Sequence, residues 1–202
     1  MKIDQDLTQP SKMNVSTCNR KIVVIGEQNV GKTCILQRLI DNTFNPNTPP
    51  TISNSTSKFS CTLSNGKEVT LTIWDTAGQE KYRSLTNVYF RDSQAAVIVF
   101  DASNKNPKPE IQQWVDSYRN VVGPKCYIIV AANKSDLIPD KQGLRSRLHD
   151  LEEELKDIPV NIVSAKDGEG IQELFEHVAY KVSEIVQEAP VIEFSEQKKG
   201  CC

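Results

Sequence analysis

The chain has 202 residues, a length that suits one domain of about 170 residues with short tails. Its 24 basic and 26 acidic side chains give a net charge of −2, which excludes the basic surface of a nucleic-acid-binding protein. There is no run of 18 apolar residues, and residues 1–20 have no apolar stretch of the secretory kind, so we expect neither a membrane span nor secretion. The six cysteines should therefore be reduced, and none has metal-ligand spacing.

The predicted elements begin with a polar arm, residues 1–19, that has no periodicity and should be disordered. KIVVIG, residues 21–26, is a short apolar run that ends at a glycine, as buried strands do. The pattern then predicts a helix over residues 31–42. Residues 44–57 contain three prolines and many hydroxyls, which predicts a loop.

A hairpin and three further strands complete the predicted sheet. Residues 58–63 and 68–75 alternate around a Ser-Asn-Gly turn, which is typical of a hairpin. The later strands are expected at 95–101, 126–133 and 160–165, and the helices near 109–122, 141–156 and 169–188. This order predicts an α/β fold whose six-stranded, mostly parallel sheet has helices on both faces. The folded domain should span residues 20–188, with a flexible tail over 189–202. Ligands of such sheets lie beyond the carboxyl ends of the strands.

The segment GEQNVGKT, residues 26–33, lies between the first predicted strand and the first predicted helix. It fits the phosphate-binding pattern G-x-x-x-x-G-K-[ST], whose backbone N–H groups and helix N-terminus attract an anion. Lys32 is placed to reach the β and γ phosphates, and the Thr33 hydroxyl is placed to bind Mg²⁺. An ordinary glycine-bounded loop is the alternative, which the flanking strand and helix disfavour.

Asp75 and Gly78 follow the second strand of the predicted hairpin. A carboxylate at this point is placed to hold the metal, through water. Gly78 would let a backbone N–H approach the γ phosphate closely, because glycine has no side chain to obstruct it. Asp75 alone would more often be a turn or capping carboxylate, but the phosphate loop upstream favours the metal role.

The segment NKSD, residues 133–136, ends the next strand but one and predicts a base site. The Asp136 carboxylate can accept N–H bonds from guanine N1 and from its exocyclic amine. Adenine offers no proton at N1, so the buried carboxylate would stay unpaired, a discrimination of about 10⁴–10⁵. Lys134 can lie over the ring, and Asn133 can tie this loop to the phosphate loop. The next strand ends in a further segment that could offer a backbone N–H to the guanine oxygen: Ser164, Ala165 and Lys166.

GEQNVGKT, WDTAGQE, NKSD and SAK together resemble the motifs of the Ras superfamily of small GTPases, over about residues 20–188. WDTAGQEKYRSL, Tyr89 and a double cysteine resemble the Rab branch. GEQNVGKT with RSLTNVYFRDSQAAVIVFD is most similar to the Golgi-associated Rab subfamily numbered six. The resemblance implies the P-loop NTPase fold of small GTPases, binding of GTP or GDP with Mg²⁺, and hydrolysis of GTP to GDP. It also implies a membrane-attached switch in vesicle traffic.

The resemblance assigns further residues to the nucleotide. Phe44 matches the aromatic residue that packs against guanine. Thr51 matches the switch I threonine that binds Mg²⁺ and the γ phosphate in the GTP state, and Gln79 matches the catalytic glutamine that orients the attacking water. The remaining contacts that it implies come from the phosphate loop and its exit: Gln28, Asn29, Val30, Gly31 and Cys34.

The segment after Thr51 departs from the family pattern. Rabs usually read Gly-x-Asp-Phe after Thr-Ile, and the Phe joins a Trp and a Tyr in an apolar patch for effectors. Here Trp74 and Tyr89 are present, but Thr56 stands where the Phe is expected. Phe59 could replace it if the hairpin carried a bulge. We therefore expect an effector surface unlike that of the family pattern.

The resemblance also implies that Cys201 and Cys202 carry two geranylgeranyl chains, which together anchor a protein stably to a membrane. The expected location is the cytoplasmic face of intracellular membranes, the Golgi above all, in exchange with the cytosol. The implied partners are an exchange factor, a GTPase-activating protein, a GDP-dissociation inhibitor and effectors.

Two alternatives stay open at this point. One is a nucleotide-locked membrane scaffold with little hydrolysis, whose altered switch I ignores the γ phosphate. The other is a different P-loop enzyme, such as an ATP-dependent kinase, against which NKSD argues. Competition of bound guanine nucleotide by ATP would decide the second.

Overall fold

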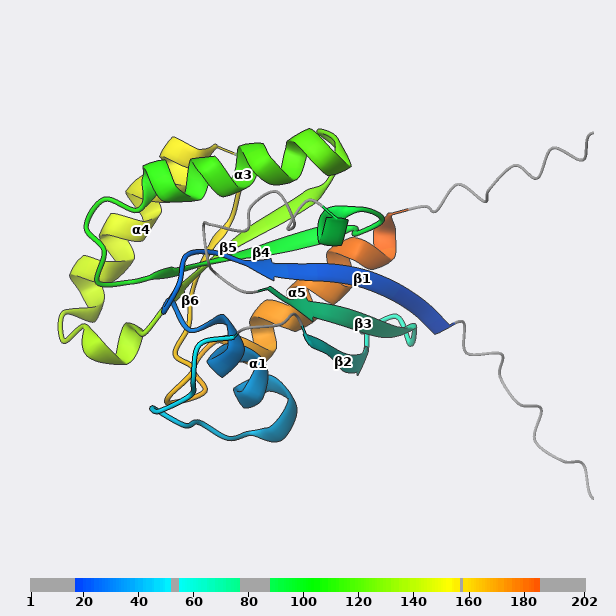
Figure 1. Cartoon of the computed structure of the whole chain (residues 1–202), viewed down its shortest axis with the longest axis horizontal. Coiled ribbons are helices and arrows are strands. Elements are labelled where there is room, and N and C mark those ends of the chain that lie inside the picture. Colours follow the sequence, from blue (N-terminus) through cyan, green and yellow to red (C-terminus); the bar gives the residue numbers. More distant parts are fainter. Residues whose placement is uncertain (1–16, 52–54, 77–87, 157, 186–202) are drawn as a thin grey trace, which may run out of the picture.

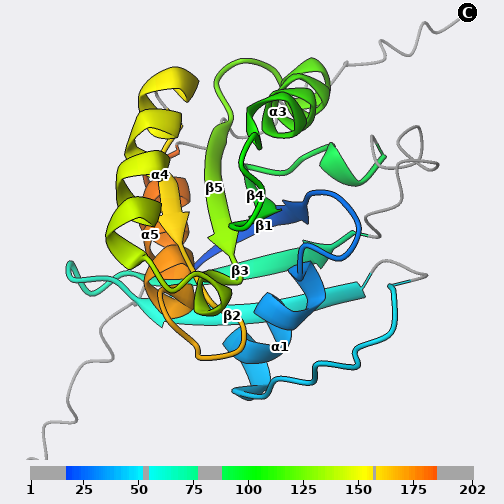
Figure 2. The ribbon, with the colours of Figure 1, turned by 90° about the vertical axis from the view of Figure 1, so that its left-hand side faces the viewer.

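The computed structural model describes residues 17–51, 55–76, 88–156 and 158–185 of the chain. In this part, six strands form one sheet in the order β2-β3-β1-β4-β5-β6. Their bounds are β1 (Thr17–Ile25), β2 (Ser55–Thr62), β3 (Glu68–Asp75), β4 (Ala95–Asp101), β5 (Tyr127–Asn133) and β6 (Val160–Ile162). Only the β2–β3 pair is antiparallel, and Figure 2 shows the strands in this order from β5 to β2. The predicted six-stranded, mostly parallel sheet is confirmed.

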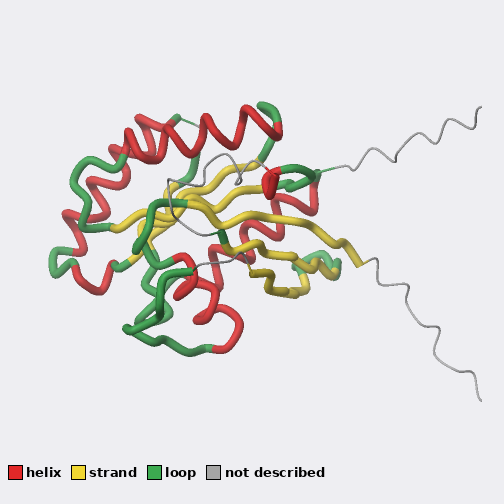
Figure 3. Tube along the Cα trace, viewed as in Figure 1, coloured by secondary structure: helices red, strands yellow, loops and turns green. Residues whose placement is uncertain are grey.

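Helices cover both faces of the sheet, as Figures 1 and 3 show. Their bounds are α1 (Lys32–Asp41), α3 (Lys108–Val122), α4 (Lys141–Leu155) and α5 (Ile171–Glu184), with a 3₁₀ turn η2 (Ser135–Leu137). On β1, Ile22 and Val24 pack with α1 and α5, while Val23 and Ile25 pack with α3 and α4. A central parallel strand buried on both sides needs such a continuous apolar run, because each face must exclude water.

The C-terminal end of α5 is held by one cation from β1 and one from the turn between β2 and β3. The buried Arg20 of β1 donates from Nε to the Val182 carbonyl (2.8 Å) and from Nη2 to the Ile185 carbonyl (2.9 Å). Lys67 donates to the Ser183 carbonyl (2.9 Å). Positive charge here complements the helix dipole and the last unpaired carbonyls. The helix ends at Glu184, before the predicted end near residue 188.

Two strands begin earlier than the sequence predicts. The arm predicted over residues 1–19 is wrong at its end, because β1 already begins at Thr17. Residues 17–19 pair in parallel with Glu68–Thr70 of β3. Similarly, β2 begins at Ser55 rather than at residue 58, because its ladder with β3 continues up to Asp75. In both cases a neighbouring strand offers backbone partners that polar side chains do not signal.

The suggestion that Phe59 replaces the missing effector phenylalanine is wrong. The β2–β3 ladder runs without a bulge and pairs Thr56 with Trp74 and Phe59 with Leu71. Because side chains alternate between faces, Phe59 lies on the face opposite to Trp74. It packs near Phe175 of α5, at 6.3 Å between ring centroids. Trp74 instead lies 5.7 Å from Tyr89, with the exposed Thr56 at the adjoining position of β2.

Several predicted residues lie outside the described ranges, namely Gly78, Gln79, Cys201 and Cys202. Within those ranges, no helix combines the length and the apolar character that a membrane span requires.

Candidate functional site

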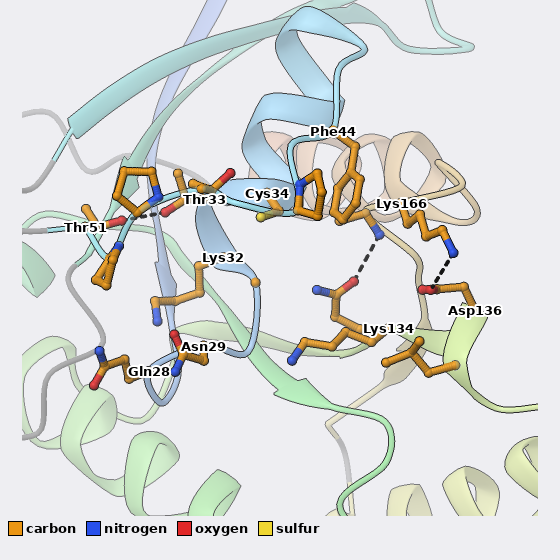
Figure 4. A pocket seen from close by; sticks show the side chains of 18 residues that line it. Gln28, Asn29, Lys32, Thr33, Cys34, Phe44, Thr51, Lys134, Asp136 and Lys166 are labelled. Atoms are coloured by element: carbon orange, nitrogen blue, oxygen red, sulfur yellow. Dashed lines mark hydrogen bonds and ion pairs between the residues drawn. The ribbon is translucent and has the colours of Figure 1, made fainter.

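A cavity of about 740 Å³ opens at the carboxyl ends of the parallel strands, within the size range of ligand pockets. Every predicted nucleotide-binding residue that the structure describes lines it, except Val30 and Ser164. These two are buried, so they support the walls rather than face the ligand. Figure 4 shows Lys32, Thr33 and Thr51 toward one end and Lys134, Asp136 and Lys166 toward the other.

The phosphate loop owes its shape to residues that tolerate left-handed backbone. Gly31, with φ of 96°, is the N-cap of α1, and a Cβ there would lie 2.4 Å from Nδ2 of Asn133. A Cβ on Gly26 would lie 2.1 Å from the Val99 carbonyl oxygen. Asn29 also has positive φ (63°), a conformation that asparagine adopts more readily than most residues. The two glycines are therefore required by the packing of the loop against β4 and β5.

Lys32 is the cation of the phosphate end. It is only 6% exposed, and its ammonium donates to the carbonyls of Gly26 (2.9 Å) and Glu27 (2.8 Å). Burial lowers the pKa of Lys32 to about 8, although the nearby carboxylates of Asp75, Glu27 and Glu110 act to raise it. Such a poorly solvated ammonium has much to gain from a phosphate.

We expect Lys32 to make the stability of the nucleotide-free protein rise with pH between about 8 and 10. In the unfolded chain the pKa of this amine returns to 10.5, so the unfolded state holds the proton longer and folding gains free energy across that window. The gain should approach about 1.4 kcal/mol per pH unit. Urea unfolding at pH 7, 8, 9 and 10 should show this rise in the free energy of unfolding for the native protein but not for Lys32→Met. Both proteins contain the same buried tyrosines, so the difference between them excludes tyrosine titration. Parallel pH curves for the two proteins would contradict the assignment.

Thr33, Thr51 and Asp75 meet beside the phosphate end. The Thr33 hydroxyl donates to Asp75 Oδ2 (2.7 Å) and lies 2.6 Å from the Thr51 hydroxyl oxygen. Asp75 is 1% exposed, and its Oδ1 has no hydrogen-bond partner among the residues that the structure describes. Burial raises the pKa of Asp75, against the opposing effects of the Thr33 hydrogen bond and Lys32. A buried carboxylate oxygen without a partner, next to two hydroxyls, fits Mg²⁺, which prefers oxygen ligands and retains part of its water shell.

The opposite end of the cavity is built around the Asp136 carboxylate. Its side chain is 9% exposed, and Lys166 Nζ lies 3.8 Å from Oδ2. The Ser164 hydroxyl donates to Oδ1 (2.9 Å). Lys134 has φ of 65° and donates to Asp101 Oδ2 (2.7 Å), which fixes its direction along the cavity wall. The carboxylate is therefore held in position and can still accept further hydrogen bonds from N–H groups, which are the donors that guanine presents.

One amide joins the two ends. The Asn133 side chain donates from Nδ2 to the Val30 carbonyl of the phosphate loop (2.8 Å) and accepts at Oδ1 from the Ala165 backbone N–H (3.1 Å). Asn133 is 1% exposed, so both bonds are shielded from water. The predicted tie between the base segment and the phosphate loop is present. The Ala165 N–H, which we considered for the guanine oxygen, is engaged by this amide.

Comparison with known proteins decides the family. The model of the Ras family matches residues 21–184. The chain belongs to the Ras family. It is a GTPase, as Ras-family and Rab proteins are, and the predicted assignment to small GTPases is confirmed.

Named relatives of this Ras-family chain are Rab proteins. A ras-related protein Rab-5B of Dictyostelium discoideum is 38% identical over 178 residues, covering 85% of this chain and 82% of the relative. RabC of the same organism is 30% identical over 190 residues, covering 90% and 96%. SEC4 of Saccharomyces cerevisiae is 31% identical over 184 residues, covering 89% and 82%. These matches support the Rab branch and do not show the subfamily numbered six.

Sequence reasoning missed part of the wall of this Ras-family pocket. The unpredicted lining residues are Pro46, Thr48, Pro49, Pro50 and Leu137. The first four lie between Phe44 and Thr51, two predicted contacts, so the connecting chain has to pass along the cavity. Proline also fixes φ and gives this segment a stiff course. Leu137 directly follows Asp136 and is 59% exposed at the outer edge.

Proposed function

We propose that this chain is a Rab-type switch that binds GTP or GDP with Mg²⁺, hydrolyses GTP to GDP and acts in vesicle traffic. One observation supports it above the others. A single cavity has the Lys32 ammonium and the Thr33 hydroxyl at one end and the Asp136 carboxylate at the other, and the Thr33 hydroxyl bonds the buried Asp75. Phosphate-binding groups alone would suit many nucleotides, and the buried carboxylate selects guanine among them.

In this proposal each end of the cavity has its own task. The P-loop N–H groups and Lys32 bind the phosphates, since Lys32 exchanges its two carbonyl partners for phosphate oxygens. Asp136 accepts from guanine, while Phe44 and the stem of Lys134 flank the base. The folded domain, predicted over residues 20–188, would carry all of these groups.

Thr33, Thr51 and Asp75 would hold Mg²⁺ as direct or water-mediated ligands. When bound, the ion supplies positive charge that offsets the charge of the β and γ phosphates. Thr51 already reaches the Thr33 hydroxyl, which supports a segment that responds to the γ phosphate and disfavours the locked scaffold. Loss of that phosphate would remove one partner of Thr51 and let the segment relax.

Gln79 and Gly78 lie outside the described residues, so their roles remain proposals. Gln79 would orient the attacking water, and the Gly78 N–H would contact the γ phosphate. Slow hydrolysis is expected without a partner, because an arginine supplied by an activating protein adds roughly 10³–10⁵ to the rate of related enzymes.

We also propose where in the cell the switch acts and which classes of protein act on it. Geranylgeranyl groups on Cys201 and Cys202 would attach the protein to a membrane, where an exchange factor, an activating protein, a GDP-dissociation inhibitor and effectors act on it. The Golgi assignment depends on the resemblance of GEQNVGKT and its companion segment to the subfamily numbered six. The matched relatives carry the names Rab-5B, RabC and SEC4.

The proposal is tested by single-turnover hydrolysis of bound GTP with Mg²⁺, in the native protein and in Gln79→Leu. We expect slow hydrolysis in the native protein and a loss of about 10-fold or more in the variant, because leucine cannot hydrogen-bond the attacking water. Tight binding of GTP with no hydrolysis in either protein would favour the scaffold. Displacement of bound GDP by ATP would overturn guanine specificity.

A further inference from the structure

The base end of the cavity depends on a loop that follows β6, residues 164–169, which we call the base loop. Its N–H groups and side chains are well tied: Asn133 accepts from the Ala165 N–H, and the Ser164 hydroxyl bonds Asp136. Two of its backbone carbonyls have a different partner. The oxygens of Ala165 and Lys166 both accept hydrogen bonds from Arg38 of α1.

Arg38 lies in the last turn of α1 and divides its guanidinium between two segments. Toward the base loop, Nε donates to the Ala165 carbonyl (3.0 Å) and Nη2 to the Lys166 carbonyl (2.6 Å). Toward its own helix, Nη1 donates to the Asn42 carbonyl (2.9 Å) and to Asn42 Oδ1 (3.0 Å). The side chain also packs under Gly168, where an added Cβ would lie 3.6 Å from Arg38 Cδ.

The two segments that Arg38 joins form adjoining walls of the cavity. Asn42 is the C-cap of α1, with φ of 52°, and sets the direction in which the chain leaves the helix toward Phe44. Both Phe44 and Lys166 line the cavity (Figure 4). The planar guanidinium of arginine has fixed donor directions, so it can hold two such walls at one separation. The flexible side chain of lysine, with its single ammonium, cannot do so.

We propose that Arg38 is a positioning residue that sets how long guanine nucleotide stays bound. The inference rests on the proposed guanine site and adds to it a residue that is not part of the cavity lining. Without Arg38, the carbonyls of Ala165 and Lys166 turn to water, and the base loop can move away from Asp136. The Arg38 hydrogen bonds to described residues go to Ala165, Lys166 and Asn42 rather than to the phosphate end, so the cleavage step for GTP that is already bound keeps its rate.

The test is the dissociation rate of GDP from the full chain, loaded in excess Mg²⁺ and chased with unlabelled GDP. Arg38→Ala should release GDP about 10- to 100-fold faster, the usual effect of losing charge-assisted hydrogen bonds. The GDP dissociation rate of Arg38→Lys should lie between that of Arg38→Ala and that of the native protein. Single-turnover hydrolysis under saturating GTP should be unchanged in both variants.

A base-specific readout separates positioning from general loosening. Inosine diphosphate lacks the exocyclic amine that Asp136 is expected to bind, so the native protein should retain GDP far longer than inosine diphosphate. In Arg38→Ala this ratio should shrink, because the base loop no longer holds guanine against Asp136. A ratio that stays the same while both nucleotides leave faster would overturn the inference.

Arg20→Ala is the matched control, since it also removes an arginine that bonds three backbone carbonyls, two of which lie at the C-terminal end of α5. It should lower thermal stability and leave GDP release as in the native protein; Lys67→Ala, at the same helix end, takes its place if Arg20→Ala does not fold. If Arg38→Ala does not fold, Arg38→Lys and Arg38→Gln carry the test, and native release rates in both overturn the inference. A native protein that does not retain GDP at all would instead refute the proposed function.

Discussion

Asp136→Asn is expected to lower the affinity for GDP by roughly 10⁴-fold, because the variant presents an N–H donor where guanine also presents one. The native carboxylate is 9% exposed and already accepts from the Ser164 hydroxyl. The asparagine amide would keep one acceptor for that hydroxyl or for guanine N1, but its NH₂ group would face the exocyclic amine. Two donors that face each other in a site closed to water leave both unsatisfied.

The same variant should gain affinity for xanthosine diphosphate, which carries a carbonyl where guanine carries the amine. The amide then meets an N–H with its oxygen and a carbonyl with its nitrogen, so complementarity is restored. Competition of a labelled nucleotide by GDP, xanthosine diphosphate and ADP measures the exchange of preference. Asp136→Ala should bind neither base well, since it restores no partner.

Asp140→Asn is the control for that experiment. Asp140 lies four residues on, and its carboxylate caps α4 by accepting from the Gly143 N–H (2.9 Å). This substitution removes the same negative charge, but Asp140 does not line the cavity, so the preference for GDP should persist. Equal loss of GDP binding in both variants would mean that charge near the cavity, rather than the pairing at Asp136, governs affinity.

The residues at the two ends of the cavity were predictable because each stands at a fixed offset from a strand end. Lys32 and Thr33 follow a glycine-bounded loop, and Asp136 follows a buried run, so local pattern and spacing sufficed. The walls between them were harder. Pro46 and Pro50 line the cavity because the segment from Phe44 to Thr51 crosses it, a path that composition predicts only as a loop.

Contacts between segments distant in the chain could not be predicted from the sequence, for a different reason. Arg38 bonds backbone carbonyls 127 and 128 residues away, and a carbonyl leaves no trace in the choice of side chain. The same holds for the early start of β1, where Thr17–Asn19 pair with β3 through the backbone ladder. Sequence pattern encodes burial and local turns well, and encodes backbone pairing poorly.

Asp75→Asn is expected to have opposite effects on the nucleotide-free and the loaded protein. Burial raises the pKa of Asp75, so its carboxylate costs stability at neutral pH, a cost that grows as pH rises from the ordinary value of 3.8 toward the raised one. Asparagine keeps an acceptor for the Thr33 hydroxyl and removes the charge. Without nucleotide the variant should therefore be at least as stable to urea at pH 7 as the native protein.

With nucleotide the order should reverse, because the neutral amide can no longer balance a divalent cation. In the native protein, chelating Mg²⁺ should speed GDP release by about 100-fold, the value of one lost charge-assisted contact. In Asp75→Asn, release in Mg²⁺ should already be as fast as in chelator. A variant that keeps the full response to chelator would place the metal elsewhere.

Glu110→Gln separates the metal role from a general loss of negative charge near the P-loop. Glu110 also acts on Lys32 and has its pKa raised by burial, and in the described part of the chain its Oε1 has no hydrogen-bond partner. It differs in having no hydrogen bond to Thr33, whose hydroxyl bonds Asp75 and Thr51 instead. The response of GDP release to chelator should therefore survive in Glu110→Gln. If it were lost in both variants, the electrostatic field around Lys32, and not a ligand at Asp75, would be what couples the cation to the nucleotide.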